Sequence, residues 1–290
     1  MPGRCPRLPM WNFSRNMPRE LEEIRDGSGI LIHMSEIAIV ARPDDTSRSL
    51  KQQTELILKR NGFTVNETKP DYVLVIGGDG TFIYAVHKYI DQLSTARFFG
   101  IHTGTLGFYT DYRDVDYDEF LRTFLSGECT EFSYPILEGI TEDSVYYGIN
   151  EIRVENAART QNMNVYINGR LFETYRGTGM CVSTQLGSTA YNRSLGGAVI
   201  EEGLPLIEMC EMAGIHHNRY RSLKAPFVMN DRNRIVFESE SFAGALLGAD
   251  SDVYPMESVH RLEIGISEEK KVRMLKGRTL SYFERLKSLF

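Results

Sequence analysis

Apolar residues in the first half of the chain occur either in short continuous runs or at helical spacing. The runs EIAIVA (36–41) and YVLVI (72–76) predict buried strands. Between them, residues 47–61 place leucine and isoleucine on one face of a predicted helix, which stops at Gly62. Two more helices are predicted at 82–93 and 117–125. This alternation of strand and helix predicts an α/β unit.

Beyond about Thr130 the pattern changes to short alternating runs bounded by turn residues. An alternation of period 2 with frequent turns is typical of antiparallel strands, so a mostly β half follows the α/β half. EEKK (268–271) is interpreted as a turn between strands, and the last residues, TLSYFERLKSLF, predict a helix with an apolar face. The alternating runs are VYYGINEIRVEN, MNVYINGRLFETY, GMCVST, RIVFESE and HRLEIGIS.

Residues 1–33 show neither helical nor strand periodicity and are rich in proline and arginine. We interpret them as a flexible leader, because a segment without periodic apolar positions has little surface to bury. Met34 opens a much better domain start, MSEIAIVARP. We therefore hypothesise that residues 1–33 are an upstream extension of a product that starts at Met34.

Composition narrows the class of protein. The chain has 290 residues, of which 42% are hydrophobic and 25% charged, and its formal net charge is −6. A net negative charge argues against a surface for nucleic acid. No apolar run approaches the roughly 18 residues of a membrane helix, so no membrane partner is expected. A reducing, cytoplasmic location is the default, because no CxxC pair occurs among Cys5, Cys129, Cys181 and Cys210.

The strand YVLVI runs directly into the glycine-rich turn GGDGT (77–81). The sequence lacks G-x-x-x-x-G-K-[ST], G-x-G-x-x-G and G-x-S-x-G, which excludes a P-loop, a Rossmann fingerprint and a nucleophile elbow. Glycines let backbone N–H groups converge on an anion, and the following helix adds its positive end. Asp79 then suits a metal that accompanies phosphate, or a proton acceptor. An ordinary strand-to-helix turn with Asp79 as helix N-cap remains open.

Two further stretches combine glycines with polar groups. Residues 177–198, GTGMCVSTQLGSTAYNRSLGGA, gather hydroxyls and glycines before a predicted helix, which suits phosphate or sugar. The stretch HTGTLGFY (102–109) repeats this chemistry and ends in Phe108 and Tyr109, two rings that could stack on a base. Any one stretch could be turn chemistry alone, but three in one chain favour a phosphate-bearing ligand.

The motifs GGDGTF, GIHTGTLGFY, INEIRV and STQLGSTAYNRSLGG, in this order and spacing, resemble the NAD kinase family of bacteria. The resemblance extends from about Met34 to the C-terminus. It implies transfer of the terminal phosphoryl group of ATP, or of inorganic polyphosphate, to the 2′-hydroxyl of the adenosine ribose of NAD. It also implies a divalent metal, Mg²⁺, which comes with the phosphate donor and is not fixed by the protein alone, and a homotetramer or homodimer.

The fold implied by the resemblance has an α/β N-terminal domain and a C-terminal all-β sandwich. The α/β domain with the GGDGT turn would cover residues 34–130, and the β-sandwich NAD-binding domain residues 131–272. A C-terminal helix, residues 273–290, would return to dock on the first domain. Such docking would cover the apolar face of the last helix.

The resemblance also assigns roles to individual residues. Asp79 matches the proton acceptor of the family, and Gly80 matches its phosphate-contacting neighbour. Asn150 and Glu151 match the pair that holds the ribose hydroxyls and the base. The other matches are NAD-binding positions, and they are Arg176, Thr189, Ala190, Tyr191, Asn192, Arg193, Ser194, Ala213 and Asp250.

The chain departs from the family pattern at three positions. Gln185 and Leu186 stand where the family has a proline and a hydroxyl residue, and Thr178 stands where it has an aspartate. These changes remove a rigid backbone position and a phosphate donor. An active NAD kinase is the function that the resemblance favours. A pseudokinase that binds NAD or NADP as a sensor is an alternative, and a lipid kinase of the same superfamily is a weaker one.

Overall fold

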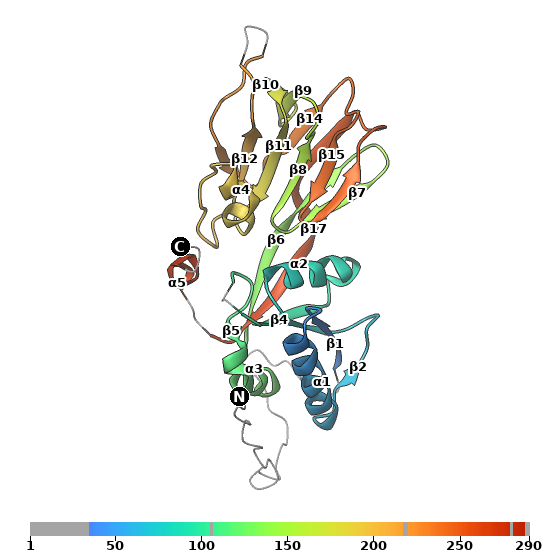
Figure 1. The fold of residues 1–290 in the computed structure, drawn as a ribbon, viewed down its shortest axis with the longest axis vertical. Helices are drawn as coiled ribbons and strands as arrows, with labels where there is room; N and C mark the ends of the chain where they lie inside the picture. The colour runs from blue at the N-terminus through green and yellow to red at the C-terminus, as the bar shows by residue number, and fades with distance from the viewer. Residues whose placement is uncertain (1–34, 105–106, 217–219, 279–280, 288–290) are drawn as a thin grey trace, which may run out of the picture.

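The computed structural model describes residues 35–104, 107–216, 220–278 and 281–287. The expectations for residues 1–33 lie outside this range. Figure 1 shows an α/β half joined to a β-rich half. The elements are β1 (Glu36–Ala41), α1 (Asp45–Arg60), β2 (Thr64–Val65), β3 (Tyr72–Ile76), α2 (Asp79–Lys88), η1 (Ile90–Gln92), β4 (Arg97–His102), β5 (Tyr112–Arg113), η2 (Asp114–Asp116), α3 (Tyr117–Ser126), β6 (Thr130–Ile140), β7 (Val145–Gly148), β8 (Glu151–Glu155), β9 (Gln161–Ile167), β10 (Arg170–Gly177), β11 (Gly179–Thr184), η3 (Gly187–Thr189), α4 (Tyr191–Ser194), β12 (Leu206–Met212), β13 (Phe227–Asn230), β14 (Ile235–Glu238), β15 (Leu246–Ala249), β16 (Asp252–Pro255), β17 (Arg261–Lys276) and α5 (Tyr282–Lys287).

The α/β half is built on parallel strands β2, β1, β3 and β4. Every residue of β3 is buried, because helices cover both faces of the sheet. On one face Val73 and Val75 pack against α2, and on the other Leu74 and Ile76 pack against α1 and α3. The continuous apolar runs of the sequence are therefore the buried centre of a two-sided sheet, as predicted.

The β-rich half is a sandwich of two sheets. Among the described residues one sheet has the order β13-β12-β11-β8-β15-β16, and its neighbouring strands are antiparallel. It packs against β9, β10, β14 and β17 of the second sheet through a shared apolar core. The residues at the centre of this core include Val154, Val165, Val182, Phe237 and Leu262. The α/β half, the β-sandwich and a final helix confirm the expected fold class.

Strand β17 crosses the boundary predicted at residue 272, and the predicted domain bounds remain a prediction. It pairs with β14 and β6 in the sandwich and then, at Arg273 and Met274, becomes the parallel neighbour of β4. EEKK (268–271) lies inside this strand at an irregularity in its register with β6, so the expected turn is wrong. One sheet thus runs through both halves, because β6 and β17 are long enough to cross the junction.

The final helix is shorter than the expected 273–290. Residues to Lys276 belong to β17, and α5 covers Tyr282–Lys287. Figure 1 shows α5 beside the junction of the two halves. Its Arg285 side chain is buried and hydrogen-bonds to the α/β half at the carbonyl of Phe108. Within the described ranges no helix is both long and apolar enough to cross a membrane.

Candidate active site

The GGDGT turn lies at the carboxyl end of β3, the edge of a parallel sheet where ligands of α/β proteins bind. Gly78 is the N-cap of α2, and Asp79 is its first residue. A side chain at Gly77 would overlap that of Thr81, whereas a Cβ at Gly80 would have no neighbour within 4 Å among the described residues. The backbone at Gly80 is thus open to a ligand at the positive end of the helix. Asp79 is not the N-cap, so the ordinary-turn interpretation is wrong in that respect.

The Asp79 carboxylate binds the backbone of the loop that follows β4. It accepts hydrogen bonds from the N–H groups of Phe108 (3.0 and 3.1 Å) and Tyr109 (3.2 Å). A Cβ at Gly107 would overlap this carboxylate, so the close approach requires glycine. Two segments picked out in the sequence for their glycines therefore meet at Asp79.

Tyr109 connects Asp79 to the second half of the molecule. Its hydroxyl donates a hydrogen bond to Asn150 Oδ1 across the junction. Its ring is 7% exposed and stacks on Phe82, with ring centroids 5.2 Å apart. Little of this ring is left for a base, and stacking of Tyr109 on a base remains a prediction. Phe108 is half-buried and keeps part of its surface open.

Asp250 organises the segment that carries Asn150 and Glu151. Its carboxylate accepts N–H hydrogen bonds from Ile149 (2.8 Å), Asn150 (2.7 Å) and Glu151 (3.2 Å). It also lies 2.7 Å from Nε2 of His87, in the last turn of α2. Because these partners occupy the carboxylate, Asp250 holds other residues in place, and its assignment as an NAD-binding position remains a prediction.

Glu151 has an unusual environment for a carboxylate. It is 5% exposed, and burial together with the nearby charge of Asp250 raises its pKa to about 8. The Arg153 guanidinium, 3.3 Å away, opposes this rise without cancelling it. Arg153 also lies over the Tyr191 ring, 5.0 Å from its centroid. Tyr191, the first residue of α4, is therefore held beside β8, the strand that begins with Glu151.

The segment 187–194 crosses Asn150 closely. A side chain at Gly187 would overlap the Asn150 carbonyl, so glycine allows the two segments to touch. Asn192 points inward, where its amide donates to Glu208 (2.7 Å) and the carbonyl of Ala198 (3.2 Å). Its side chain is therefore part of the core, and any contact with a ligand falls to its backbone. Five residues of the segment keep exposed or half-exposed surface: Thr189, Ala190, Tyr191, Arg193 and Ser194.

Two sequence family models match the chain. The ATP-NAD kinase N-terminal domain matches residues 42–129, and the ATP-NAD kinase C-terminal domain matches residues 149–276. The chain belongs to the NAD kinase family. Its curated relatives include NAD kinases from Streptococcus pneumoniae, among them those of strains Hungary19A-6 and R6, each 34% identical over 259 residues that cover 88% of this chain and 95% of the relative.

Solved structures of an NADH kinase and of an NAD kinase have a similar fold. A yeast NADH kinase complexed with NADH superimposes with a TM-score of 0.74 and 16% identity, covering 89% of this chain and 86% of that one. An NAD kinase from Archaeoglobus fulgidus in complex with ATP gives a TM-score of 0.71 at 23% identity, covering 87% and 99%. At these identities the likeness concerns the fold alone.

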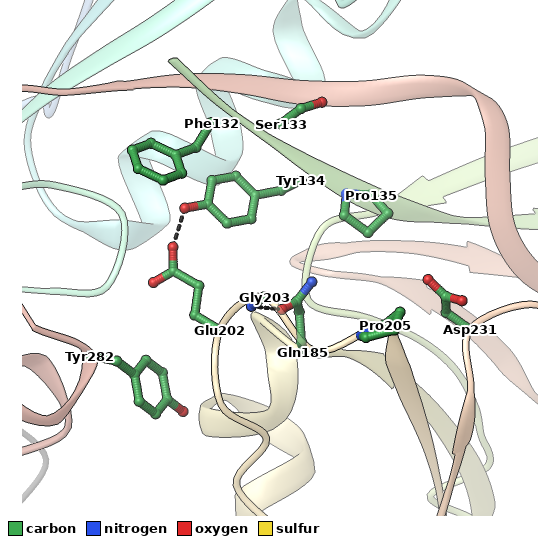
Figure 2. Close-up of a pocket in the computed structure, with 10 residues that line it drawn as sticks. All are labelled: Phe132, Ser133, Tyr134, Pro135, Gln185, Glu202, Gly203, Pro205, Asp231 and Tyr282. Carbon is green, nitrogen blue, oxygen red and sulfur yellow. Dashed lines mark hydrogen bonds between the residues drawn. The ribbon is translucent and has the colours of Figure 1, made fainter. Parts of the chain in front are cut away.

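Two departures from the NAD kinase pattern lie where β11 ends. Gln185 is buried, and its Oε1 accepts the N–H of Gly203. Leu186 packs against an apolar cluster that includes Phe108. Gln185 faces a cavity of about 470 Å³, shown in Figure 2, in which the Tyr134 hydroxyl donates to Glu202. The cavity is lined by Phe132, Ser133, Tyr134, Pro135, Gln185, Glu202, Gly203, Pro205, Asp231 and Tyr282.

Arg176 and Ala213 do not join the other predicted residues. Arg176 is in β10, just before β11 begins, whereas Gln185 follows the end of β11. The Arg176 carbonyl accepts the N–H of Ile215, and Ala213 follows β12 at this same end. Thr178, the third departure, donates its hydroxyl to the carbonyl of Met212 there (3.1 Å). Within a single chain, the predicted NAD-binding positions therefore form two groups, which lie at opposite ends of β11.

Sequence reasoning did not select three residues that the fold brings to the NAD kinase site. His102 ends β4, and a Cβ at Gly78 would lie 3.1 Å from its Nε2. Burial lowers the pKa of His102, opposed by the charge of Asp79, so it is neutral beside the turn. His87 and Arg285 contact Asp250 and Phe108. His102 lies in the GIHTGTLGFY motif, whereas no local signal identifies the other two.

The residues of the turn fit a metal held mainly by the phosphate donor. Across the described ranges no group of three or more histidine, cysteine, aspartate or glutamate side chains is arranged to hold a metal ion. Mg²⁺ commonly keeps several waters and binds through one or two carboxylates together with substrate phosphates. Asp79 supplies one carboxylate beside the open backbone of Gly80, which fits that mode.

Proposed function

We propose that this chain is an NAD kinase, which transfers the terminal phosphoryl group of ATP to the 2′-hydroxyl of the adenosine ribose of NAD. One observation carries the proposal. Tyr109 binds Asp79 through its N–H and Asn150 through its hydroxyl. The proton acceptor at the phosphate-binding turn and the amide for a ribose thus have a fixed relative position, as a phosphoryl transfer between two bound substrates requires.

In the proposed reaction Asp79 accepts the proton of the 2′-hydroxyl as that oxygen attacks the terminal phosphorus. The bond between this phosphorus and the bridging oxygen breaks, and ADP leaves. Because Tyr109 donates to Asn150 Oδ1, the amide nitrogen of Asn150 remains to donate to a ribose hydroxyl. Glu151, whose pKa is near 8, is protonated at neutral pH and can donate as well as accept.

The phosphates of the donor are proposed to lie at the start of α2. The open backbone at Gly80 and the helix end favour an anion there. Mg²⁺ brought in with these phosphates would neutralise charge on the transferring group. Polyphosphate offers the same phosphate chemistry, so we include it as an alternative donor.

We also propose that a second copy of the chain completes the NAD site. Arg176 and Ala213 are too far along β11 to reach Asp79, and the same end of the sandwich exposes apolar side chains. Elsewhere on the sandwich, Phe172 of β10 and Phe227 of β13 form a stacked pair, with centroids 5.4 Å apart. A homodimer or homotetramer would cover the exposed apolar side chains of this half, which include Ile215 and Leu223 near Arg176, and Leu171 and Phe172 at the start of β10. We propose a cytoplasmic location, because the buried Cys181 and Cys210 are free thiols.

A coupled assay tests the function. The purified chain is incubated with NAD, Mg²⁺ and either ATP or polyphosphate, and NADP is measured with an NADP-specific dehydrogenase. We expect NADP with ATP, at a rate that depends on the divalent metal. Binding of NAD without any NADP, with every donor and metal, would instead identify the chain as a sensor. Light scattering on the same sample measures the oligomeric state.

A further inference from the structure

Phe108 is held at both ends of its backbone. Its N–H donates to the Asp79 carboxylate, at 3.0 and 3.1 Å. Its carbonyl accepts a hydrogen bond of 2.8 Å from Nη1 of Arg285. These two contacts come from segments that are far apart in the sequence, since Asp79 begins α2 and Arg285 lies in α5. The position of the loop at Asp79 therefore depends on both residues.

Arg285 is placed to fix this loop. Its side chain is 1% exposed, and the same Nη1 reaches the carbonyl of Thr110 at 3.3 Å. Its Nη2 forms an ion pair with Asp111, whose other oxygen accepts the N–H of Gly277. The planar guanidinium therefore spans the backbone from 108 to 111. A lysine has a single ammonium and cannot reproduce this planar fork.

The rest of α5 holds Arg285 against the loop. The Tyr282 hydroxyl donates to the carbonyl of Ile200 in the sandwich (2.9 Å), and its ring lies edge-on to Phe108, with centroids 6.4 Å apart. Figure 2 shows Tyr282 beside Glu202 at the cavity wall. The helix is thus attached to both halves, next to the site.

A contribution to stability alone does not account for a buried arginine. Burying a charged guanidinium carries a large desolvation cost, and a buried ion pair is often no more stabilising than apolar residues of the same volume. An apolar residue would cover the loop equally well but would leave the carbonyls of Phe108 and Thr110 without these donors. The arrangement of Arg285 therefore favours a role in orienting the loop.

We propose that Arg285 is a positioning residue for phosphoryl transfer, which acts through Phe108 and Tyr109 to orient the Asp79 carboxylate. This inference rests on the proposed NAD kinase function. A group that orients the proton acceptor contributes mainly in the transition state, so its loss lowers kcat more than it raises KM. Loss of folded protein alone would lower the active fraction and leave KM and the turnover per folded molecule unchanged.

The test uses the full chain and the variants Arg285→Lys and Arg285→Ala. Lysine keeps the charge opposite Asp111 but not the two carbonyl contacts. We expect Arg285→Lys to fold and its kcat to fall about tenfold, with a loss of about 10²-fold for Arg285→Ala, the size expected for a displacement of about 1 Å. KM for NAD should change by less than about threefold in both variants, because the contacts that bind NAD equally in the ground state and the transition state remain.

Arg278→Ala is the matched control. Arg278 lies in the same C-terminal segment and forms ion pairs with Asp116 and Glu119, but within the described chain it forms no hydrogen bond or ion pair with residues 107–111. We expect its kcat per folded molecule to stay near that of the unmodified chain. A fall in kcat equal to that of Arg285→Lys would overturn the proposal, since general loosening of the segment would then explain both.

Amide hydrogen exchange separates this inference from the proposed function, because it needs no turnover. In Arg285→Lys we expect faster exchange at the N–H groups of Phe108 and Tyr109, the two that bind Asp79. Unchanged exchange, together with kcat within about twofold of the unmodified enzyme, would refute the positioning role. If the unmodified chain makes no NADP, the proposed function fails, and the exchange rates alone decide whether Arg285 holds the loop.

Discussion

His87 and Asp250 join the last turn of α2 to the β-sandwich, with 2.7 Å between His87 Nε2 and Asp250 Oδ2. The first residue of the same helix is Asp79. Asp250 also accepts hydrogen bonds from the backbone N–H groups of Asn150 and Glu151. Helix α2 therefore carries the proposed proton acceptor at its start and, in its last turn, contacts the residue that positions the proposed ribose contacts. This contact therefore holds the two sides of the site at a fixed separation.

The His87 contact predicts that stability falls as the pH rises above about 6.5. Burial opposes the charged imidazole, but the hydrogen bond and charge of Asp250, with Asp252 3.7 Å away, raise the pKa of His87. A raised pKa gives a stabilisation that is full below the unfolded value, about 6.5, and is lost as pH rises through the folded value. His87→Gln should show a smaller decline in the free energy of unfolding from pH 6 upward, measured by urea titration. An identical decline in both proteins would contradict the assignment.

Glu151 predicts a second, separable decline. Its pKa is raised to about 8 by burial and by Asp250, so its contribution is full below the unfolded value of about 4.3 and is lost as pH rises through about 8. Glu151→Gln removes this titration and keeps the shape of the side chain. The variant should lose less stability than the unmodified chain between about pH 4.3 and 8, the interval between the unfolded and folded pKa values. Thermal unfolding at stepped pH values tests this, and an equal loss in both proteins would show that the pKa of Glu151 is not raised in the native state.

Asp79→Asn should preserve the fold and remove most of the activity. The amide has nearly the shape of the carboxylate but cannot accept the proton, so we expect turnover to fall by roughly 10²–10⁴-fold. Steady-state NADP formation measures the loss, and a melting curve checks the fold. Turnover close to that of the unmodified chain would reject Asp79 as the proton acceptor.

Tyr109→Phe should affect NAD binding with the fold intact. The ring keeps its stacking on Phe82, but Asn150 Oδ1 loses its donor. We expect binding of NAD to weaken by roughly 0.5–1.5 kcal/mol, the net contribution of one hydrogen bond. Calorimetric titration with NAD tests this. An affinity equal to that of the unmodified chain would mean that Asn150 holds its orientation without Tyr109.

The double change Gln185→Pro and Leu186→Thr restores the family pattern and tests its departures. Proline removes the hydrogen bond to the N–H of Gly203, and threonine removes an apolar side chain from the Phe108 cluster. We expect the apparent affinity for ATP to improve by roughly 0.5–1.5 kcal/mol, because the threonine hydroxyl adds one donor. Stability should fall by about 1–3 kcal/mol. Activity that appears only in the double variant would identify the unmodified chain as a sensor.

The sequence predicts those elements of the fold whose burial shows in a short run of neighbouring residues. β3 is recognisable because all five of its residues are buried, which leaves a continuous apolar run. β17 is not, because it crosses the junction with EEKK in its middle, and a charged stretch of this kind normally marks a turn. The parallel pairing of Met274 with Phe98 depends on residues far apart in the chain, and no local pattern encodes it.

The candidate site divides in the same way. Asp79 can be selected from the sequence because glycines flank it, and glycines next to a carboxylate indicate an exposed backbone that can bind an anion. Asp250 binds residues about one hundred positions earlier in the chain, so its role follows only from the fold. Asn192 shows the opposite case. The family resemblance assigns it to NAD binding, and the fold adds that its side-chain amide is hydrogen-bonded in the interior to Glu208.

The passage of β17 through both halves has a consequence for how the molecule can be divided. A gene fragment that ends near residue 130 would encode an α/β half without residues 273–274, the strand segment that pairs with the outer side of β4. The edge of β4 would then be left with unpaired N–H and C=O groups, a surface prone to aggregation. Two separately expressed fragments would therefore need each other to complete one sheet, so we expect the halves to behave as complementing parts and not as interchangeable modules.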